Sequence, residues 1–221
     1  MVESSDTALQ PAPGRSRRNR GSEVVRAALL EAAIGEFAAK GFAGASGRRI
    51  AAEAGSHQSQ INYHFSSTEE LWKAALLHLL DELDLAVLEQ LDGVATDDLP
   101  EVFAGVVRGL VRFAARRPEL NRIMMHEGAA PGARLAWFVD ERLRRRHADL
   151  VEAWVALRET GVAADVDPDV LYHSLIGAAS LLYANAPEAE LLGIEPGEPS
   201  LIDRHAESLI TLFLPGRTKE T

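Results

Sequence analysis

Side chains that can form hydrogen bonds with DNA are concentrated in one short segment of the chain. Glutamine and asparagine amides can pair with the edge of adenine, serine hydroxyls can pair with several bases, and tyrosine and histidine can reach phosphates. Ile61 and Phe65 lie four residues apart, on what would be the opposite face of a helix, and would anchor it to a small core. The residues that would form the polar face are Gln58, Ser59, Gln60, Asn62, Tyr63 and His64.

A helix-turn-helix would position this polar face. Residues 48–54 have helical apolar spacing, Gly55 suits the tight turn that ends them, and residues 58–65 follow at once. Two short helices joined by a glycine-containing turn can place the second helix in the major groove of DNA, which is about 12 Å wide. The spacing therefore predicts a DNA-binding unit.

Helical signals dominate the rest of the chain. Ser22 is a good N-cap for a helix that Gly41 ends, and Ser67 with Glu70 forms a capping box that opens a long helix. No segment shows period-two alternation between turn residues, so we expect no β-sheet. The sequence predicts an all-α fold of about nine helices, with a three-helix N-terminal domain followed by a larger helical bundle. The later helices are expected at residues 99–116, 118–128, 131–160, 168–186 and 200–214.

The charge of the chain is unevenly distributed. The 221 residues include 23 Lys and Arg against 33 Asp and Glu, a formal net charge of −10, which by itself argues against a nucleic-acid binder. Residues 15–65 nevertheless carry a net charge of +4, and residues 66–221 a net charge of −12. This asymmetry indicates a basic binding module attached to an acidic body. An N-terminal stretch that we expect to be disordered closes in Arg15, Arg17, Arg18 and Arg20.

Several other classes of protein are disfavoured. The absence of cysteine excludes disulfides, thiolate metal sites and cysteine nucleophiles. No HExxH, GxSxG or Walker pattern is present, so we expect no catalytic residue, no metal ligand and no cofactor. Residues 170–187 contain no Asp, Glu, Lys or Arg, but their polar residues and Pro187 favour a buried helix over a membrane span. No signal peptide is visible, and we expect a cytoplasmic location.

The region from Phe37 to Leu71 resembles the DNA-binding domain of TetR-family transcriptional repressors. The resemblance implies a homodimer whose two recognition helices read half-sites about 34 Å apart on double-stranded operator DNA. It also implies a small-molecule inducer, largely apolar, that releases the repressor from the operator. The rest of the chain resembles the family only as an all-helical chain of suitable length. The ordered positions that carry the resemblance are Phe37–Gly41-Phe42, Ile50-Ala51, Ala54-Gly55, Ile61, Tyr63-His64-Phe65 and Glu69–Leu71.

The resemblance implies DNA-binding roles position by position. Arg48 takes a place where the family often reads a base or contacts a phosphate, and Ser46 would either cap the same helix or touch a phosphate. Tyr63 and His64 match an aromatic–histidine pair that holds the DNA backbone. The recognition-helix positions are taken by Gln58, Ser59, Gln60 and Asn62.

The chain also departs from the family pattern. Threonine is common where it has Ala45, and tyrosine is common where it has Asn62. Thr68 replaces a frequent lysine at the start of the fourth helix, which removes one expected phosphate contact and leaves its role open. The arginines of residues 15–20 would compensate by following the phosphates or entering the minor groove, unless they form a merely solvated tail.

The acidic body is expected to contain the dimer interface and the inducer pocket. Small residues within 170–187 permit close helix approach, so this segment and the last helix would form an intersubunit four-helix bundle; an intrachain core helix is the alternative. Residues 127–134 would be a mobile entrance to the pocket or a plain connection. Expected dimer contacts are Leu175, Gly177, Ala178, Leu181, Leu201, Leu209 and Phe213. Expected pocket residues are Met124, Met125, His126, Trp137, Phe138, Trp154 and Tyr183.

These expectations divide the chain into three parts. Residues 1–20 form a disordered basic tail, residues 21–66 the helix-turn-helix domain, and residues 67–221 the ligand-binding and dimerisation domain. The function expected is that of a sequence-specific DNA-binding repressor, although nothing in the chain fixes repression over activation. Two rivals remain. One is an enzyme, and the other is a constitutive DNA-binding or architectural protein whose body only dimerises.

Overall fold

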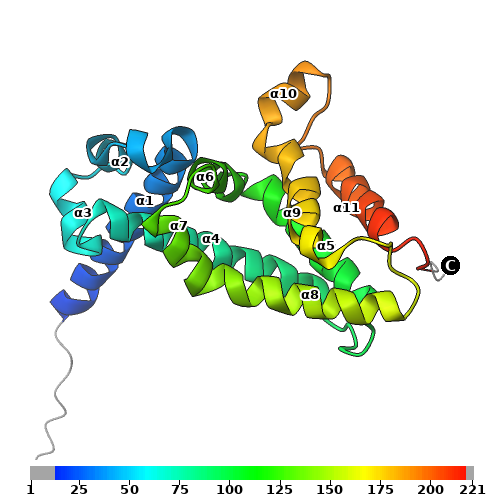
Figure 1. Ribbon diagram of the computed structural model, residues 1–221. Helices are drawn as coiled ribbons and strands as arrows, with labels where there is room; N and C mark the ends of the chain where they lie inside the picture. Colours follow the sequence, from blue (N-terminus) through cyan, green and yellow to red (C-terminus); the bar gives the residue numbers. More distant parts are fainter. Residues whose placement is uncertain (1–12, 218–221) are drawn as a thin grey trace, which may run out of the picture.

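The computed structural model describes residues 13–217, and these residues form only helices, turns and loops. The predicted all-α fold is confirmed. Figure 1 shows a group of N-terminal helices, the head, at one end, and a larger helical bundle, the body, at the other. The helices are α1 (Pro13–Gly44), α2 (Gly47–Glu53), α3 (Gln58–Phe65), α4 (Thr68–Leu91), α5 (Leu99–Arg116), α6 (Glu119–Gly128), α7 (Ala133–Phe138), the π-helical turn η1 (Val139–Leu143), α8 (Arg144–Glu159), α9 (Pro168–Ala184), α10 (Ala186–Leu191) and α11 (Pro199–Phe213).

The first helix is longer than predicted. We expected disorder over residues 1–20, but α1 begins at Pro13, so residues 13–20 are helical, and residues 1–12 lie outside the described part of the chain. Proline suits the first turn of a helix, and lengthening an existing helix needs no new nucleus. The arginines of residues 15–20 therefore lie on a helical backbone that continues into the head.

Apolar residues from α1, α2 and α3 form the core of the head. Gly41 interrupts α1 with a φ of 63°, a left-handed conformation that favours glycine, and directs the chain towards α2. Phe37, Ile50 and Ile61 come from α1, α2 and α3 respectively and meet in one core, each at most 2% exposed. Ile61 and Phe65 anchor α3 as their spacing predicts, which leaves its polar residues on the outer face.

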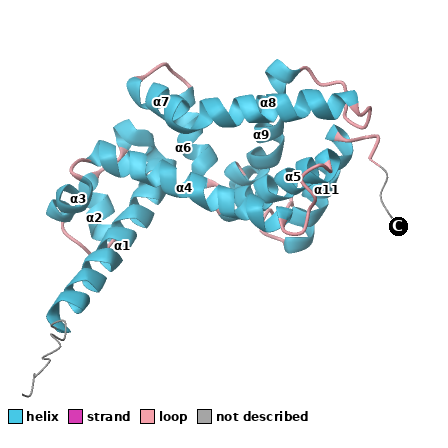
Figure 2. Ribbon diagram, turned by 90° about the horizontal axis from the view of Figure 1, so that it is seen from below, coloured by secondary structure: helices cyan, strands magenta, loops and turns pink. Residues whose placement is uncertain are grey.

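Helix α4 belongs to both the head and the body. Leu71 and Trp72 near its start are fully buried in the head core. Its later turns pack closely against α5 in the body, where both views place the two helices side by side (Figure 2). Gly109 permits this approach, because a Cβ at that position would lie 2.6 Å from the Cα of Val87. One helix thus connects the DNA-binding candidates with the interior of the body.

A second core holds the body together. The indole of Trp154 in α8 is fully buried between Phe103 of α5 and Phe213 of α11, with ring centroids 5.1 and 6.1 Å away. Its N–H donates to the carbonyl oxygen of Val166 at 3.0 Å, so the buried polar atom is satisfied. This packing joins the middle and last helices of the chain.

Two helix ends differ from the predicted ones. Helix α9 ends at Ala184, and Pro187 does not stop it but lies in the first turn of the additional short helix α10, where proline is well tolerated. The helix expected at 131–160 is α7, η1 and α8 in succession, with one π-helical turn between the two α-helices. No helix in the described part of the chain is both long and hydrophobic enough to cross a membrane.

Packing does not separate the head from the body at residue 66. Phe113, Ile123 and Phe138 belong to the body in sequence, yet they are buried in the same core as the helices of the head. The predicted domain boundary between residues 66 and 67 therefore stays a prediction, and the two parts share an apolar junction.

Candidate DNA-binding surface and ligand cavity

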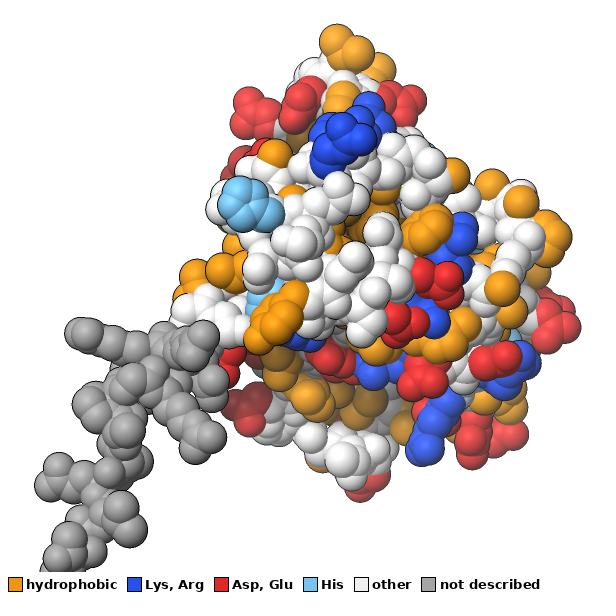
Figure 3. Space-filling model, turned by 90° about the vertical axis from the view of Figure 1, so that its left-hand side faces the viewer, with side chains coloured by type: hydrophobic (Ala, Val, Ile, Leu, Met, Phe, Trp, Pro, Cys, Tyr) orange, Lys and Arg blue, Asp and Glu red, His pale blue; other side chains and the backbone are white. Residues whose placement is uncertain are grey.

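Helix α3 presents an uncharged polar face to solvent. Figure 3, which looks at the molecule from the side of the head, shows a face on which backbone and side chains that are neither charged nor hydrophobic, drawn white, cover more of the surface than Lys and Arg side chains, drawn blue. Such a face suits hydrogen bonding to base edges more than general attraction to phosphate. Of the predicted recognition residues, the exposed ones are Gln58, Ser59, Asn62 and Tyr63, and the half-buried ones are Gln60 and His64.

Tyr63 and His64 form an adjacent aromatic pair at the end of this face. Their rings are 4.8 Å apart and nearly perpendicular, and Tyr63 is 75% exposed. Together with Gln60 they border a shallow hollow whose other side is formed by Ser22 and Val25 of α1. The phenol and the imidazole are thus available to a phosphate that lies between α1 and α3.

Two adjacent arginines of α2 have different surroundings. Arg49 donates from Nε to the Glu36 carboxylate at 2.8 Å and from Nη2 to the carbonyl of Gly44, and the same guanidinium holds the pKa of Glu36 below its usual range. Arg48 is exposed and forms no ion pair with the described residues. Ser46 caps α2, since its Oγ accepts the N–H of Arg49 at 3.4 Å. Arg48 is therefore the arginine that a phosphate or base can reach.

The start of α4 supplies little positive charge. Thr68 is half-buried and follows Ser67, whose Oγ accepts the Glu70 N–H at 3.1 Å. Only this half of the predicted capping box forms. The Ser67 N–H donates to the carbonyl oxygen of Phe65 at 2.8 Å, and the Glu70 carboxylate pairs with Lys73 at 2.8 Å. Over residues 21–65 the sequence has four basic and four acidic residues, so the net charge of +4 resides in residues 15–20.

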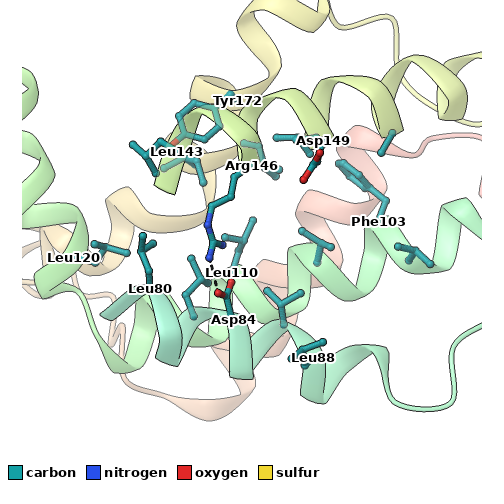
Figure 4. Close-up of a pocket in the computed structure, with 18 of the residues that line it drawn as sticks. Leu80, Asp84, Leu88, Phe103, Leu110, Leu120, Leu143, Arg146, Asp149 and Tyr172 are labelled. Atoms are coloured by element: carbon teal, nitrogen blue, oxygen red, sulfur yellow. Dashed lines mark hydrogen bonds and ion pairs between the residues drawn. The ribbon is translucent and has the colours of Figure 1, made fainter. Parts of the chain in front are cut away.

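A cavity of about 620 Å³ lies in the body between α4, α5, α8 and α9 (Figure 4). Leucine, valine and phenylalanine form most of its walls. Its volume and apolar lining are those of small-molecule binding sites in proteins. Its polar lining consists of Asp84, Arg146, Asp149 and Tyr172.

Ion pairs bridge the two helices on either side of this cavity. Arg146 of α8 reaches Asp84 of α4, with Nη2 2.5 Å from Oδ2, as Figure 4 shows. One turn earlier, Arg142 pairs with Asp81 of α4. Tyr172 of α9 is half-buried beside the cavity, and this burial raises the pKa of its phenol. Side-chain charges thus connect α8 to the helix that leads to the head.

Most residues predicted for the pocket lie elsewhere. Of the seven, Phe138 alone lines the cavity. Trp154 is a core residue, and Tyr183 contacts Nδ1 of His205 through its hydroxyl at 3.0 Å. Burial raises the pKa of Tyr183 to about 12 and lowers the pKa of His205. The prediction included four large aromatic side chains, and such side chains often fill cores because they bury the most apolar surface.

The remaining pocket predictions fall near the junction with the head. His126 packs against Gly41, where a Cβ would lie 3.2 Å from its ring. The ring centroids of Trp137 and Trp72 are 6.2 Å apart. Neither His126 nor Trp137 lines the cavity, and their contact with a ligand stays a prediction. Neither of the two other predicted residues lines the cavity; they are the half-buried Met124 and the exposed Met125.

The segment of residues 127–134, expected to be a pocket entrance or a plain connection, contacts the head. Arg134 stacks over the ring of Phe42 at 3.9 Å and pairs with Glu127 at 3.2 Å. No residue of 127–134 lines the cavity. The cavity residues themselves were missed because an apolar stripe on a helix shows that it is buried, but not which neighbour leaves a gap beside it.

An ion-pair network also joins head and body. Arg117, which follows α5, lies 3.1 Å from Glu31 of α1 and 3.2 Å from Glu82 of α4. His78 lies within 3.4 Å of the same two carboxylates. These contacts hold α1 and α4 at the end of α5, so the position of the head depends on the packing of the body.

The predicted dimer residues divide into two groups. Leu175, Leu209 and Phe213 are buried within the protomer and are therefore corrected to intrachain core positions. Leu201 is half-buried, whereas Gly177 and Ala178 are exposed. An exposed face remains on α9 and α11, and its large apolar members are Val170, Leu181 and Leu212, at 52%, 51% and 68% exposure.

Comparison with known proteins places this geometry among bacterial regulators. Residues 29–75 match the family model described as bacterial regulatory proteins, tetR family. The chain is 34% identical over 156 residues to the HTH-type transcriptional repressor SCO4008 of Streptomyces coelicolor, an alignment that covers 69% of this chain and 76% of that protein.

Solved structures show the same fold. The structure of AibR in complex with isovaleryl coenzyme A and operator DNA matches with a TM-score of 0.68 and 22% identity, over 86% of this chain and 98% of that one. A putative fatty acid metabolism regulator of Clostridium perfringens matches with a TM-score of 0.67 and 16% identity, over 87% of this chain and 100% of that one. Both similarities extend through the head and the body.

Proposed function

The chain belongs to the TetR family of bacterial regulatory proteins and is a DNA-binding transcriptional regulator, and we propose that it is a homodimeric repressor which a small ligand releases from its operator. The observation that carries the proposal is the connection between its two sites. Helix α4 contributes Leu71 and Trp72 to the core beneath the recognition helix and Leu83 and Asp84 to the wall of the cavity.

The DNA-binding part of the proposal rests on the exposed face of α3. Gln58, Ser59 and Asn62 read base edges in the major groove, and Gln60 contributes from its half-buried position. Arg48 and the pair of Tyr63 and His64 contact the backbone on either side. Ser46 and Thr68 lie at helix starts beside this face, where their hydroxyls reach phosphates. The helical extension with four arginines supplies the non-specific attraction that the balanced charge of residues 21–65 lacks.

Dimerisation supplies the spacing that two half-sites require. The exposed face of α9 and α11 carries Gly177, Ala178 and Leu181, which allow close approach of a second copy. An isologous interface of this kind places two recognition helices on one face of the duplex, about 34 Å apart. Any change in the angle between head and body then changes the distance between the two heads.

The ligand acts by favouring one distance between the two heads of the dimer over another. A molecule in the cavity separates α4 from α8, and because α4 is fixed in the head core, the head moves with it. Only a ligand that binds the two states with different affinity can shift their populations. A shift from 99:1 to 1:99 needs a preference of about 5.5 kcal/mol, which the two cavities of a dimer share.

The relatives are consistent with repression. SCO4008 is named as a repressor, and AibR is described with both a ligand and operator DNA. We assign the protein to the cytoplasm because its operator is there, and we assign it no catalytic activity. A constitutive DNA-binding protein would share the head, but the cavity between α4 and α8 favours the ligand-responsive alternative.

An operator titration tests this function. A labelled fragment from upstream of the gene is titrated with protein, and the proposal expects saturable binding that competitor DNA of scrambled sequence does not displace. Gln60→Ala is expected to relax selectivity at one base pair, and Asn62→Ala at a neighbouring one. Equal affinity for the promoter fragment and the scrambled fragment would overturn the proposal.

A further inference from the structure

The charges that line the cavity do not balance. Asp84 and Arg146 form an ion pair across it, and both are partly shielded, at 42% and 33% side-chain exposure. Asp149, one turn after Arg146 on α8, adds a second carboxylate, and Figure 4 shows it beside the same cavity. The charged lining therefore sums to one negative charge in an otherwise apolar chamber.

Asp149 is only weakly compensated. Among the described residues its one ion-pair partner is Arg145, whose Nε lies 3.6 Å from Oδ2. The Arg145 side chain is 91% exposed and that of Asp149 is 65% exposed, so Asp149 lies at the open side of the cavity. An exposed pair of this length is screened by water and salt and contributes little. The Asp149 carboxylate is thus available to a ligand in a way that the Arg146 guanidinium is not.

An anionic ligand would meet a less favourable site. To reach Arg146 it must displace Asp84, which leaves a partly shielded carboxylate without its partner. It would also approach the second carboxylate of Asp149. A cationic ligand does not compete with Asp84 for Arg146, and it gains attraction from Asp149 and from the rings that line the cavity, Phe103, Phe138 and Tyr172.

We propose that this cavity selects apolar organic cations, with Asp149 as the residue that recognises the positive charge. The proposal rests on the proposed function, in which the same cavity is the ligand site. The apolar walls take up the hydrocarbon body of the ligand, and the cavity of about 620 Å³ admits a compact polycyclic or multiply arylated molecule.

Two probes of nearly equal shape and opposite charge provide the test. Tetraphenylphosphonium and tetraphenylborate are titrated separately into the purified full-length protein, without DNA and in sodium buffer, by isothermal calorimetry. We expect the phosphonium to bind at least about tenfold more tightly than the borate, because the charged lining favours a cation. Equal affinity, tighter binding of the borate, or binding of neither ion would overturn the proposal.

A matched pair of variants locates the recognition. Asp149→Asn is expected to weaken binding of the phosphonium by at least about fivefold and to narrow its advantage over the borate. Asp140→Asn is the control. Asp140 forms an i,i+4 ion pair with exposed Arg144, as Asp149 does with Arg145, but it does not line the cavity. Its substitution removes the same charge and is expected to leave the affinities for both ions unchanged. A phosphonium affinity that Asp149→Asn does not alter would assign the selectivity to another group and contradict the proposal.

The same samples separate this proposal from the proposed function. Sequence-specific binding to the promoter fragment is measured in parallel without either ion. If that binding is present while the borate is preferred, the regulator stands and the cation class is wrong. If specific DNA binding is absent while the phosphonium binds through Asp149, the cation site stands and the regulatory function fails.

Discussion

Arg146 of α8 reaches across the cavity to Asp84 of α4, and the helix that carries Asp84 begins three residues after the recognition helix α3 ends. The contact is made by side chains, since the apolar cavity lies between the two helices. It therefore fixes the position of α4 without filling the space that a ligand would use. A ligand-responsive regulator needs such a connection between a cavity and a DNA-binding helix.

Breaking this contact is expected to change DNA affinity without any ligand. Asp84→Asn leaves Arg146 without its carboxylate partner, so α4 is no longer held to α8. The heads then take up more often a distance that does not fit the operator. We expect operator affinity to fall roughly three- to tenfold, within the range of about 0.5–2 kcal/mol by which single residues change the coupling between sites. Fluorescence anisotropy with the promoter fragment measures it.

A reversed pair provides the control for that variant. The double change Asp84→Arg with Arg146→Asp restores opposite charges at the same two positions and is expected to recover most of the affinity. If Asp84→Asn binds the operator as tightly as the unaltered protein, the ion pair has no part in coupling.

Substitutions of the two neighbouring arginines of α2 are expected to have different effects, one on DNA affinity and the other on the free energy of unfolding. Arg48→Ala should weaken DNA binding and lower the slope of log affinity against log salt by about 0.9, the effect of one phosphate contact. Arg49→Ala should lower the free energy of unfolding instead, because it leaves Glu36 without the guanidinium that satisfies it. Salt titrations of DNA binding and urea denaturation of both variants decide the matter. If instead Arg49→Ala weakened DNA binding and Arg48→Ala did not, the Arg49 guanidinium would have to leave Glu36 and contact the DNA.

The head was the part of the molecule most accessible to prediction. Its helices are specified locally, by Ile61 and Phe65 at four-residue spacing, by Gly55 at a turn and by Ser67 as a cap. Its outer face follows once these residues are assigned to the core. The N-terminal end of α1 was not predicted, because a charged segment without apolar residues gives no sign that a neighbouring helix will continue through it.

The body was predicted as a bundle but not as a site. Which helix faces meet depends on contacts between residues far apart in the chain, such as Arg146 with Asp84 or Trp154 with Phe103. Of the aromatic residues expected to line a pocket, Trp154 and Tyr183 complete a core instead. Leucines expected at the dimer face, such as Leu175, are buried within the protomer. The spacing of apolar residues shows which face of a helix is buried, but not whether the same chain or a second copy covers it.

The exposed face of α9 is expected to hold the dimer together. Ala178→Glu combined with Leu181→Glu places two charges on a surface that a second copy would bury, and we expect the protein to sediment as a monomer and to lose operator binding. Val155→Glu is the control, because it places a charge on an exposed apolar position of a helix outside the proposed interface, 44% exposed on α8. A double variant that remains a dimer would place the interface elsewhere.

Two glycines are expected to respond oppositely to the same substitution. Gly109→Ala forces a Cβ to within 2.6 Å of the backbone of Val87, so α4 and α5 must separate, at a cost of about 1–3 kcal/mol in the free energy of unfolding. Gly35→Ala in α1 meets nothing within 4 Å and is expected to stabilise the protein by about 0.5–1 kcal/mol. Urea denaturation at one protomer concentration measures both. Equal effects would mean that α4 and α5 are not in this close contact.

The central claim, that filling the cavity releases the operator, is tested most directly by a variant that needs no ligand. Val106 of α5 lines the cavity, and Val106→Trp places an indole within it. The account predicts at least tenfold weaker binding to the promoter fragment by fluorescence anisotropy, with the dimer and the melting transition retained. Operator affinity equal to that of the unaltered protein, in a variant that remains a folded dimer, would contradict it.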